Sequence, residues 1–159
     1  MMGFIRCFMY CFALGLMSFF IGRLFALVHF RPGRFPWREY SFERGGKYYN
    51  RFFIKKWKDR IPDMSRIFFM IMPEKKISIE IDLEVLGKMI NETCLAEAVH
   101  VFLCIGSIGC LFIWRGPGGV IMALLFFLGN IPFIMVQRYN RARYIKTQES
   151  MDKKRSFRH

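Results

Sequence analysis

The sequence lacks the short motifs that mark many well-known catalytic and metal sites. It contains no C-x-x-C pair, no Cys/His spacing suited to zinc, no H-E-x-x-H, no G-x-S-x-G and no Gly-rich phosphate loop. Acidic residues are few, with 12 Asp and Glu against 25 Lys and Arg. The five cysteines lie mostly in apolar runs, so we interpret them as packing residues and not as a disulfide framework.

Apolar side chains, in contrast, are abundant. Of 159 residues, 53% are hydrophobic and 18% are aromatic, and 19 are Phe. A chain of this length suits one domain, whose core is too small to bury so much apolar surface. The net charge of +13 in addition requires an anionic partner surface. A membrane satisfies both requirements.

Three apolar stretches approach the length of about 20 helical residues that a bilayer crossing takes. They cover residues 4–29, 98–114 and 120–136. Between the last two, Arg115-Gly-Pro-Gly-Gly119 stops one helix and permits a tight reversal. We therefore predict a single all-α membrane domain over residues 1–159, with about three transmembrane helices and an antiparallel hairpin whose apex is Pro117.

The charge distribution predicts the orientation. Residues 31–95 carry 14 Lys and Arg against nine Asp and Glu, and residues 138–159 carry eight against two. Because positive charge is enriched on the cytosolic side, the N-terminus is expected outside and both segments in the cytosol. In the 31–95 segment aromatic and basic residues interleave, which is typical of amphipathic helices in the headgroup layer. Basic residues mixed with aromatics can also indicate nucleic-acid binding, but three predicted spans make that interpretation the weaker one. In residues 76–82 apolar and polar side chains alternate, which is typical of a short strand.

Ionisable residues at the edge of the second span are functional candidates, because such positions are costly. Glu97 and His100 are three apart and share a face of the expected helix. The pair suits general-base catalysis, with the carboxylate orienting the imidazole, and Glu92 is a further candidate that substrate or water could bridge to His100. A metal site and a plain helix-ending ion pair remain the alternatives.

The hairpin brings a second polar cluster to the same depth. With Pro117 as apex, His100 faces Ile134 and Glu97 faces Gln137. We therefore predict one cytosolic pocket whose substrate-binding residues come from the third span and its end: Asn130, Gln137, Arg138, Tyr139, Asn140 and Arg141. The plainer alternative is a basic membrane anchor.

Four motifs carry a resemblance to a known family. They read Phe42-Glu43-Arg-Gly-Gly46-Lys47-Tyr-Tyr-Asn50, Lys56-Trp57-Lys58-Asp-Arg60-Ile-Pro62-Asp63, Glu92-Thr93-x-x-Ala96-Glu97-x-x-His100 and Asn130-x-Pro132-x-x-x-Val136-Gln137-Arg138-Tyr139-Asn140-Arg141-x-Arg143. In this order, over about residues 36–144, they resemble the glycosyl-4,4'-diaponeurosporenoate acyltransferase family of bacterial integral membrane proteins.

The resemblance implies a multi-pass enzyme of the bacterial cell membrane that transfers a fatty acyl chain to a sugar hydroxyl of a glycosylated, carotenoid-glycoside-like lipid. The matching polar positions include the candidates above, and Lys56, Trp57 and Arg60 of the second motif join the predicted substrate-binding residues. We expect no metal and no cofactor, with acyl-CoA or acyl carrier protein as co-substrate.

Two other function classes compete with acyl transfer. One is a non-catalytic membrane adaptor that binds anionic lipid or a partner. The other is a metal-dependent membrane hydrolase that uses Glu92, Glu97 and His100 as ligands. For the acyltransferase, the expected partners are membrane lipids, the lipid-linked acceptor and the acyl donor, with a homo-oligomer as an option and no nucleic acid.

Overall fold

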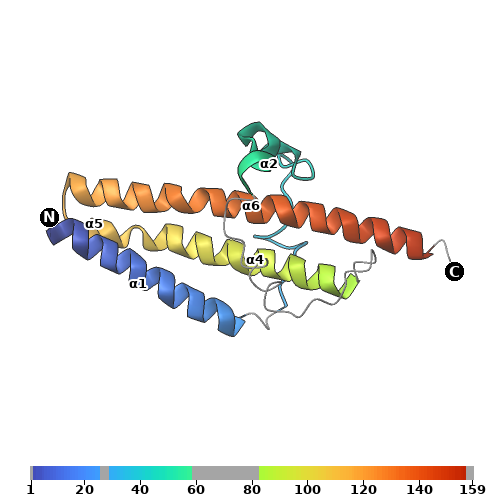
Figure 1. Ribbon diagram of the computed structural model, residues 1–159, viewed down its shortest axis with the longest axis horizontal. Helices are drawn as coiled ribbons and strands as arrows, with labels where there is room; N and C mark the ends of the chain where they lie inside the picture. The colour runs from blue at the N-terminus through green and yellow to red at the C-terminus, as the bar shows by residue number, and fades with distance from the viewer. Residues whose placement is uncertain (1, 26–28, 59–82, 157–159) are drawn as a thin grey trace. The chain divides into compact units, whose positions relative to one another are not determined.

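The computed structural model describes residues 2–25, 29–58 and 83–156. In chain order its elements are α1 (Met2–Phe25), the 3-10 helix η1 (Lys47–Phe52), α2 (Ile54–Trp57), α4 (Leu83–Gly106), α5 (Gly109–Ile113) and α6 (Pro117–Ser156) (Figure 1). Within these ranges there is no strand. The strand predicted for residues 76–82 and the candidate Arg60 lie outside the described residues.

Three helices are long and apolar enough to cross a membrane. They run over Met2–Gly22, Leu83–Ile113 and Pro117–Lys153. This confirms the all-α prediction with three helices that could span a membrane, although the second and third helices extend well beyond the predicted apolar stretches of 98–114 and 120–136. Adding residues to an existing helix is easier than starting a new one, so the polar residues that flank each apolar run can continue its helix.

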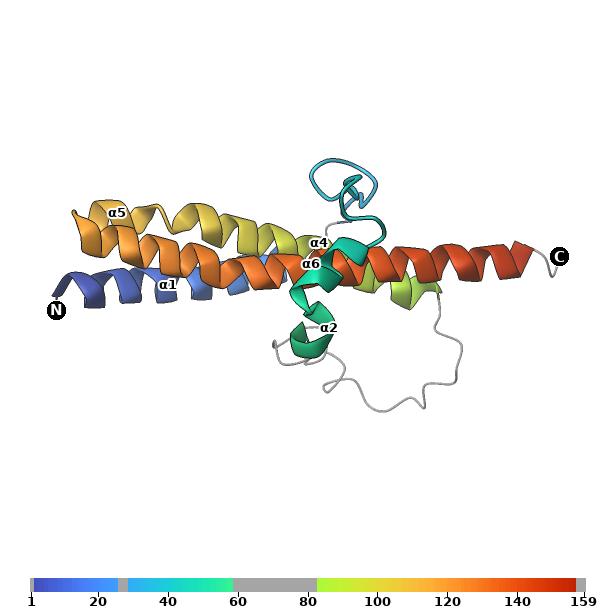
Figure 2. The ribbon, with the colours of Figure 1, turned by 90° about the horizontal axis from the view of Figure 1, so that it is seen from above.

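The described residues form two compact units, and the first comprises Met1–Val28 and Leu95–Met135. Its core is made by Cys7, Cys11, Cys110 and Ala123, which bring α1, α5 and α6 together (Figures 1 and 2). The Sγ atoms of Cys11 and Cys110 lie 3.5 Å apart. All five cysteines are free and buried, which confirms their interpretation as small packing residues.

The reversal between α5 and α6 is confirmed and depends on glycine. Trp114 is extended, and Gly116 has a φ of 105°, a conformation that L side chains rarely adopt. Pro117 is the first residue of α6, where its missing N–H has no helical partner to lose. A Cβ at Gly119 would meet the carbonyl oxygen of Trp114, so the chain can turn this tightly only with glycine at that position.

The second unit comprises His29–Cys94 and Val136–His159. The segment before η1 is fastened to α4 by two hydrogen bonds, from the Phe30 amide to Asn91 Oδ1 at 2.6 Å and from Trp37 Nε1 to the Cys94 carbonyl at 3.0 Å. Phe52 at the end of η1 and Phe53, which joins η1 to α2, are both exposed, and basic residues stand on either side of them.

Candidate active site

His100 in α4 belongs to the first unit, where it makes two specific contacts with α6. Its Nδ1 atom lies 2.9 Å from Oδ1 of Asn130. Its ring stacks on Phe133 with 4.5 Å between ring centroids and 17° between planes. Asn130 is buried and His100 is half-buried. Together these contacts fix both the position and the plane of the imidazole.

The hydrogen bonds of Asn130 also determine which imidazole nitrogen carries the proton. Asn130 Nδ2 donates to the Phe126 carbonyl, one turn earlier in α6, at 2.8 Å. The amide oxygen is therefore the atom that faces His100, and an amide oxygen only accepts hydrogen bonds. Nδ1 must then be the protonated nitrogen, and in the neutral ring Nε2 keeps its lone pair. A lone pair on a positioned imidazole is what a general base requires.

Glu97 lies one turn before His100 in the same helix and is buried, with an exposed fraction of 6%. The predicted i,i+3 arrangement on a helix is thus present. The imidazole nevertheless donates its hydrogen bond to Asn130, which was predicted only as a substrate-binding residue. Glu92 is half-buried in the second unit. The catalytic roles of these residues stay predictions.

The predicted register of the hairpin was wrong. An apex at Pro117 placed His100 opposite Ile134, whereas its contacts are with Asn130 and Phe133. The physical reason is that the chain turns before Pro117, through the extended Trp114 and the positive φ of Gly116. His100 and Asn130 are each 15 residues from Arg115, so the centre of the hairpin lies about two residues earlier.

A second buried polar network lies in the second unit and involves Glu43, a residue that sequence reasoning had not singled out. The Arg138 guanidinium donates two hydrogen bonds to its carboxylate, from Nε to Oε1 at 2.7 Å and from Nη2 to Oε2 at 2.9 Å. The two side chains are only 10% and 4% exposed. The Tyr49 hydroxyl and the Tyr40 amide also donate to Glu43. Two signals pointed to it: its place in the first family motif, and its position as an acid immediately before the Arg44-Gly-Gly turn.

The network shifts the pKa values of two of its members. Burial alone would raise the pKa of Glu43, but the hydrogen bonds from Arg138, Tyr49 and the Tyr40 amide, together with the charge of Arg138, lower it. Burial raises the pKa of the Tyr49 hydroxyl, and its hydrogen bond to the Glu43 carboxylate raises it further. At neutral pH the network therefore contains an ionised carboxylate and a protonated phenol.

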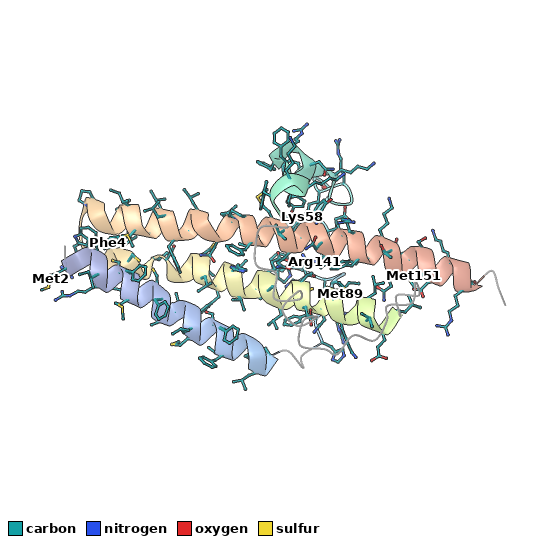
Figure 3. All side chains as sticks on the ribbon, viewed as in Figure 1. Met2, Phe4, Lys58, Met89, Arg141 and Met151 are labelled. Carbon is teal, nitrogen blue, oxygen red and sulfur yellow. The ribbon has the colours of Figure 1, made fainter. Side chains whose placement is uncertain are left out.

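The other predicted substrate-binding residues lie in the second unit in different environments. Gln137, Tyr139, Asn140 and Arg141 are buried. Arg141 Nη1 lies 3.9 Å from the Sγ atom of Cys94 in α4, and its side chain is labelled in Figure 3. Trp57 is half-buried and donates to the Phe52 carbonyl at 2.7 Å, while Lys56 is exposed. The structure therefore brings Arg138 and Arg141 together with Glu43, and it leaves the Lys56 side chain exposed.

The sequence profile of the glycosyl-4,4'-diaponeurosporenoate acyltransferase family matches residues 33–150. The chain belongs to this family. It is 31% identical to the glycosyl-4,4'-diaponeurosporenoate acyltransferase of Staphylococcus aureus strain MRSA252 over 134 residues, which are 82% of this chain and 78% of the relative. The same enzyme of strain Newman is 32% identical over 118 residues, covering 72% and 69% of the two chains. No solved structure matches the chain.

Family membership makes the protein an acyltransferase, and the matched region contains both networks. His100, Asn130, Glu43 and Arg138 all lie within residues 33–150, whereas α1 precedes this range. Within the described residues we find no group of three or more His, Cys, Asp or Glu side chains that could hold a metal ion.

Proposed function

We propose that the protein is a membrane-embedded acyltransferase that moves a fatty acyl chain from an acyl thioester to a hydroxyl of a glycosylated lipid. Membership of the glycosyl-4,4'-diaponeurosporenoate acyltransferase family carries this proposal. The relatives' name supports a carotenoid-glycoside-like acceptor. Acyl-CoA or acyl carrier protein is the proposed donor.

The apolar surface of the helices supports the membrane location. Large hydrophobic side chains are exposed along α1 and at the end of α5, including Phe12 at 55%, Leu24 at 77% and Phe112 at 76%. Exposed apolar surface of this extent is typical of contact with lipid. A membrane location also suits the chemistry, since both the acceptor and the transferred acyl chain are lipids. We propose an N-terminus outside the cell and a cytosolic C-terminus, in line with the distribution of basic residues.

In the proposed reaction His100 is the general base. Its Nε2 atom takes the proton of the acceptor hydroxyl as the hydroxyl oxygen attacks the thioester carbonyl. The tetrahedral intermediate then collapses, the C–S bond breaks, and the imidazolium returns the proton to the leaving thiolate. The products are the new ester and a free thiol. Asn130 holds Nδ1–H throughout, and we propose that Glu97 stabilises the imidazolium charge.

Substitutions of His100 and Asn130 test this assignment. His100→Ala should lower kcat at least about a hundredfold, the lower end of what general-base catalysis contributes. Asn130→Ala should lower kcat by a smaller factor. The imidazole is still present in this variant, but no hydrogen bond keeps the proton on Nδ1. The double variant should be little worse than His100→Ala, since residues that act as a unit are not additive.

The matched control is His29→Ala, which removes an exposed histidine and should leave kcat unchanged. Glu97→Gln should cost less than His100→Ala if the carboxylate only assists. A larger loss with Glu97→Gln would make Glu97 the base. An unchanged kcat in the folded Asn130→Ala variant would show that the hydrogen bond to Nδ1 plays no part in catalysis.

A further inference from the structure

The ring of Phe133 lies against one face of the His100 imidazole. The two ring centroids are 4.5 Å apart and the ring planes differ by 17°, so the rings are stacked and do not meet edge to face. Phe133 is half-buried, as His100 is. An aromatic ring in this position can do more than hold the imidazole in its plane, because its face carries partial negative charge.

The imidazole is held from two directions by neighbouring residues of α6. Asn130 and Phe133 are three apart in this helix and therefore lie on one side of it. Asn130 approaches the edge of the imidazole, at Nδ1, and Phe133 approaches its face. All three residues belong to the first unit. Neither contact uses Nε2, so both can persist while this nitrogen takes a proton.

Proton transfer creates a positive charge in surroundings that contain few anionic groups. The sequence of the first unit, residues 1–28 and 95–135, contains one carboxylate, that of Glu97. Placing a charge in apolar surroundings is costly unless polar or charged groups compensate it. A neighbour that attracts the imidazolium more strongly than the neutral ring would therefore lower the barrier to proton transfer.

The Phe133 ring meets the geometric requirement for this preference. A cation within about 6 Å of the centroid of an aromatic ring, over its face, is attracted by the quadrupole of that ring, and the attraction grows when water is excluded. At 4.5 Å, the stacked imidazole lies within this distance. The neutral imidazole gains only stacking from the contact, whereas the imidazolium gains the cation–π attraction in addition. The contact is thus stronger after proton transfer than before it.

We propose that Phe133 stabilises the imidazolium form of His100 during acyl transfer through a cation–π contact. Phe133 is a positioning residue in this proposal, because it acts through His100. The carboxylate of Glu97 and the face of Phe133 would then share the compensation of one charge. The proposal rests on the proposed function, because it takes His100 as the general base from it.

Fluorination of the Phe133 ring separates its charge distribution from its packing. Phenylalanines that carry one, three or five ring fluorines nearly keep the shape of the side chain but weaken, and finally abolish, the negative charge of its face. The kcat should fall stepwise along this series and end roughly 2- to 30-fold below wild type, the range expected for a cation–π contact. A role in packing alone predicts a constant kcat, and that result would overturn the proposal.

The matched control is the same fluorinated series at Phe127, a residue of α6 whose side chain is 41% exposed. It should leave kcat unchanged. An equal fall of kcat in both series would show that fluorine acts through the helix or the lipid and would also overturn the proposal. The variant with a single fluorine differs from wild type by one atom, so it keeps the comparison valid if the pentafluorinated protein folds poorly.

A chemical measurement without substrate separates this contact from the proposed function. Diethyl pyrocarbonate is attacked at a carbonyl carbon by the imidazole Nε2, a C–O bond breaks, ethyl carbonate leaves, and the ring becomes positive until Nδ1 releases its proton. The rate at His100, followed by mass spectrometry of its peptide, should fall along the Phe133 series by a similar factor. His29 is exposed and serves as the internal reference with a constant rate.

The two measurements together distinguish the possible failures. If the rate at His100 falls but the wild-type protein transfers no acyl group, the proposed function fails and the contact between Phe133 and the imidazolium stands. If the wild-type protein transfers an acyl group but neither kcat nor the rate at His100 responds to fluorination, the role of Phe133 is refuted and the proposed function stands.

Discussion

Replacing Arg138 by leucine should detach the segment before η1 from α6. In the structure Arg138 is the only described residue that joins the Glu43 carboxylate to the carbonyls of Pro36 and Arg38. Without it the buried carboxylate would lose its ion-pair partner. Removing one partner of a buried ion pair typically costs about 3–5 kcal/mol. A change of this size raises the population of the locally open state roughly a hundredfold to several-thousandfold.

Hydrogen exchange followed by mass spectrometry measures this opening. The amide of Tyr48, which donates to the Glu43 carbonyl at 3.2 Å, should exchange faster in Arg138→Leu by up to that factor. The control Lys146→Leu removes an exposed cation from the same helix and should have no effect. Removing both charges, in Glu43→Leu with Arg138→Leu, should be less harmful than Arg138→Leu alone, because no buried charge is left unpaired. Wild-type exchange in Arg138→Leu would refute this account of the network.

The same network predicts a pH dependence with a definite sign. The pKa of Glu43 is lowered in the folded protein, chiefly by the hydrogen bonds that overcome the effect of burial. Its contribution to stability is therefore fully present above the unfolded pKa, roughly 4.3, and is lost as the pH falls through the folded value. Exchange at Tyr48, corrected for the intrinsic rate, should rise as the pH is lowered below about 4.3. Arg138→Leu should not show this rise, because its carboxylate has lost the charged partner.

Two further predictions concern the membrane part of the chain. Reporter fusions after Val28, Pro117 and His159 should report inside, outside and inside, and a cytosolic N-terminus would contradict the orientation deduced from charge. Gly119→Ala should destabilise the hairpin by about 2 kcal/mol, or roughly 4–8 °C in the unfolding temperature for a chain of this size, because the new Cβ would collide with backbone oxygens that cannot move aside. Gly15→Ala, whose Cβ meets nothing within 4 Å, is the control, and equal unfolding temperatures for the two variants would disprove the close approach.

The helices could be predicted from the sequence because their signals are local. Apolar runs of near-membrane length predicted three spans, and the glycines and proline of residues 115–119 predicted the reversal. The register of the hairpin could not be predicted in the same way. It depends on which residue takes the positive φ, and Gly116 takes it instead of either neighbouring glycine after Pro117. An error of two residues was enough to put Ile134 in the place of Asn130.

Long-range pairing explains what the sequence left undetected. Glu43 and Arg138 are 95 residues apart, and no periodic pattern links them. An arginine after an apolar span resembles both a membrane anchor and an anion site, so the sequence alone suggested a ligand where the fold supplies a carboxylate. The pairing of His100 with Asn130 could have been predicted from the sequence, because both residues belong to motifs on the two arms of one predicted hairpin.

The two hydrogen-bonded pairs differ in a way that separates a structural role from a chemical one. In the Glu43–Arg138 pair both carboxylate oxygens and all three guanidinium nitrogens have partners within the protein, so the pair stabilises the fold and has little left to offer a substrate. In the His100–Asn130 pair the amide bonds both to the Phe126 carbonyl and to the imidazole, and within the described residues the imidazole is held through Nδ1 alone. A positioned side chain with one reactive atom left over is what proton transfer needs. Helix α6 thus supplies Arg138, whose nitrogens all hydrogen-bond within the protein, and Asn130, which positions His100 and leaves its Nε2 atom able to accept a proton.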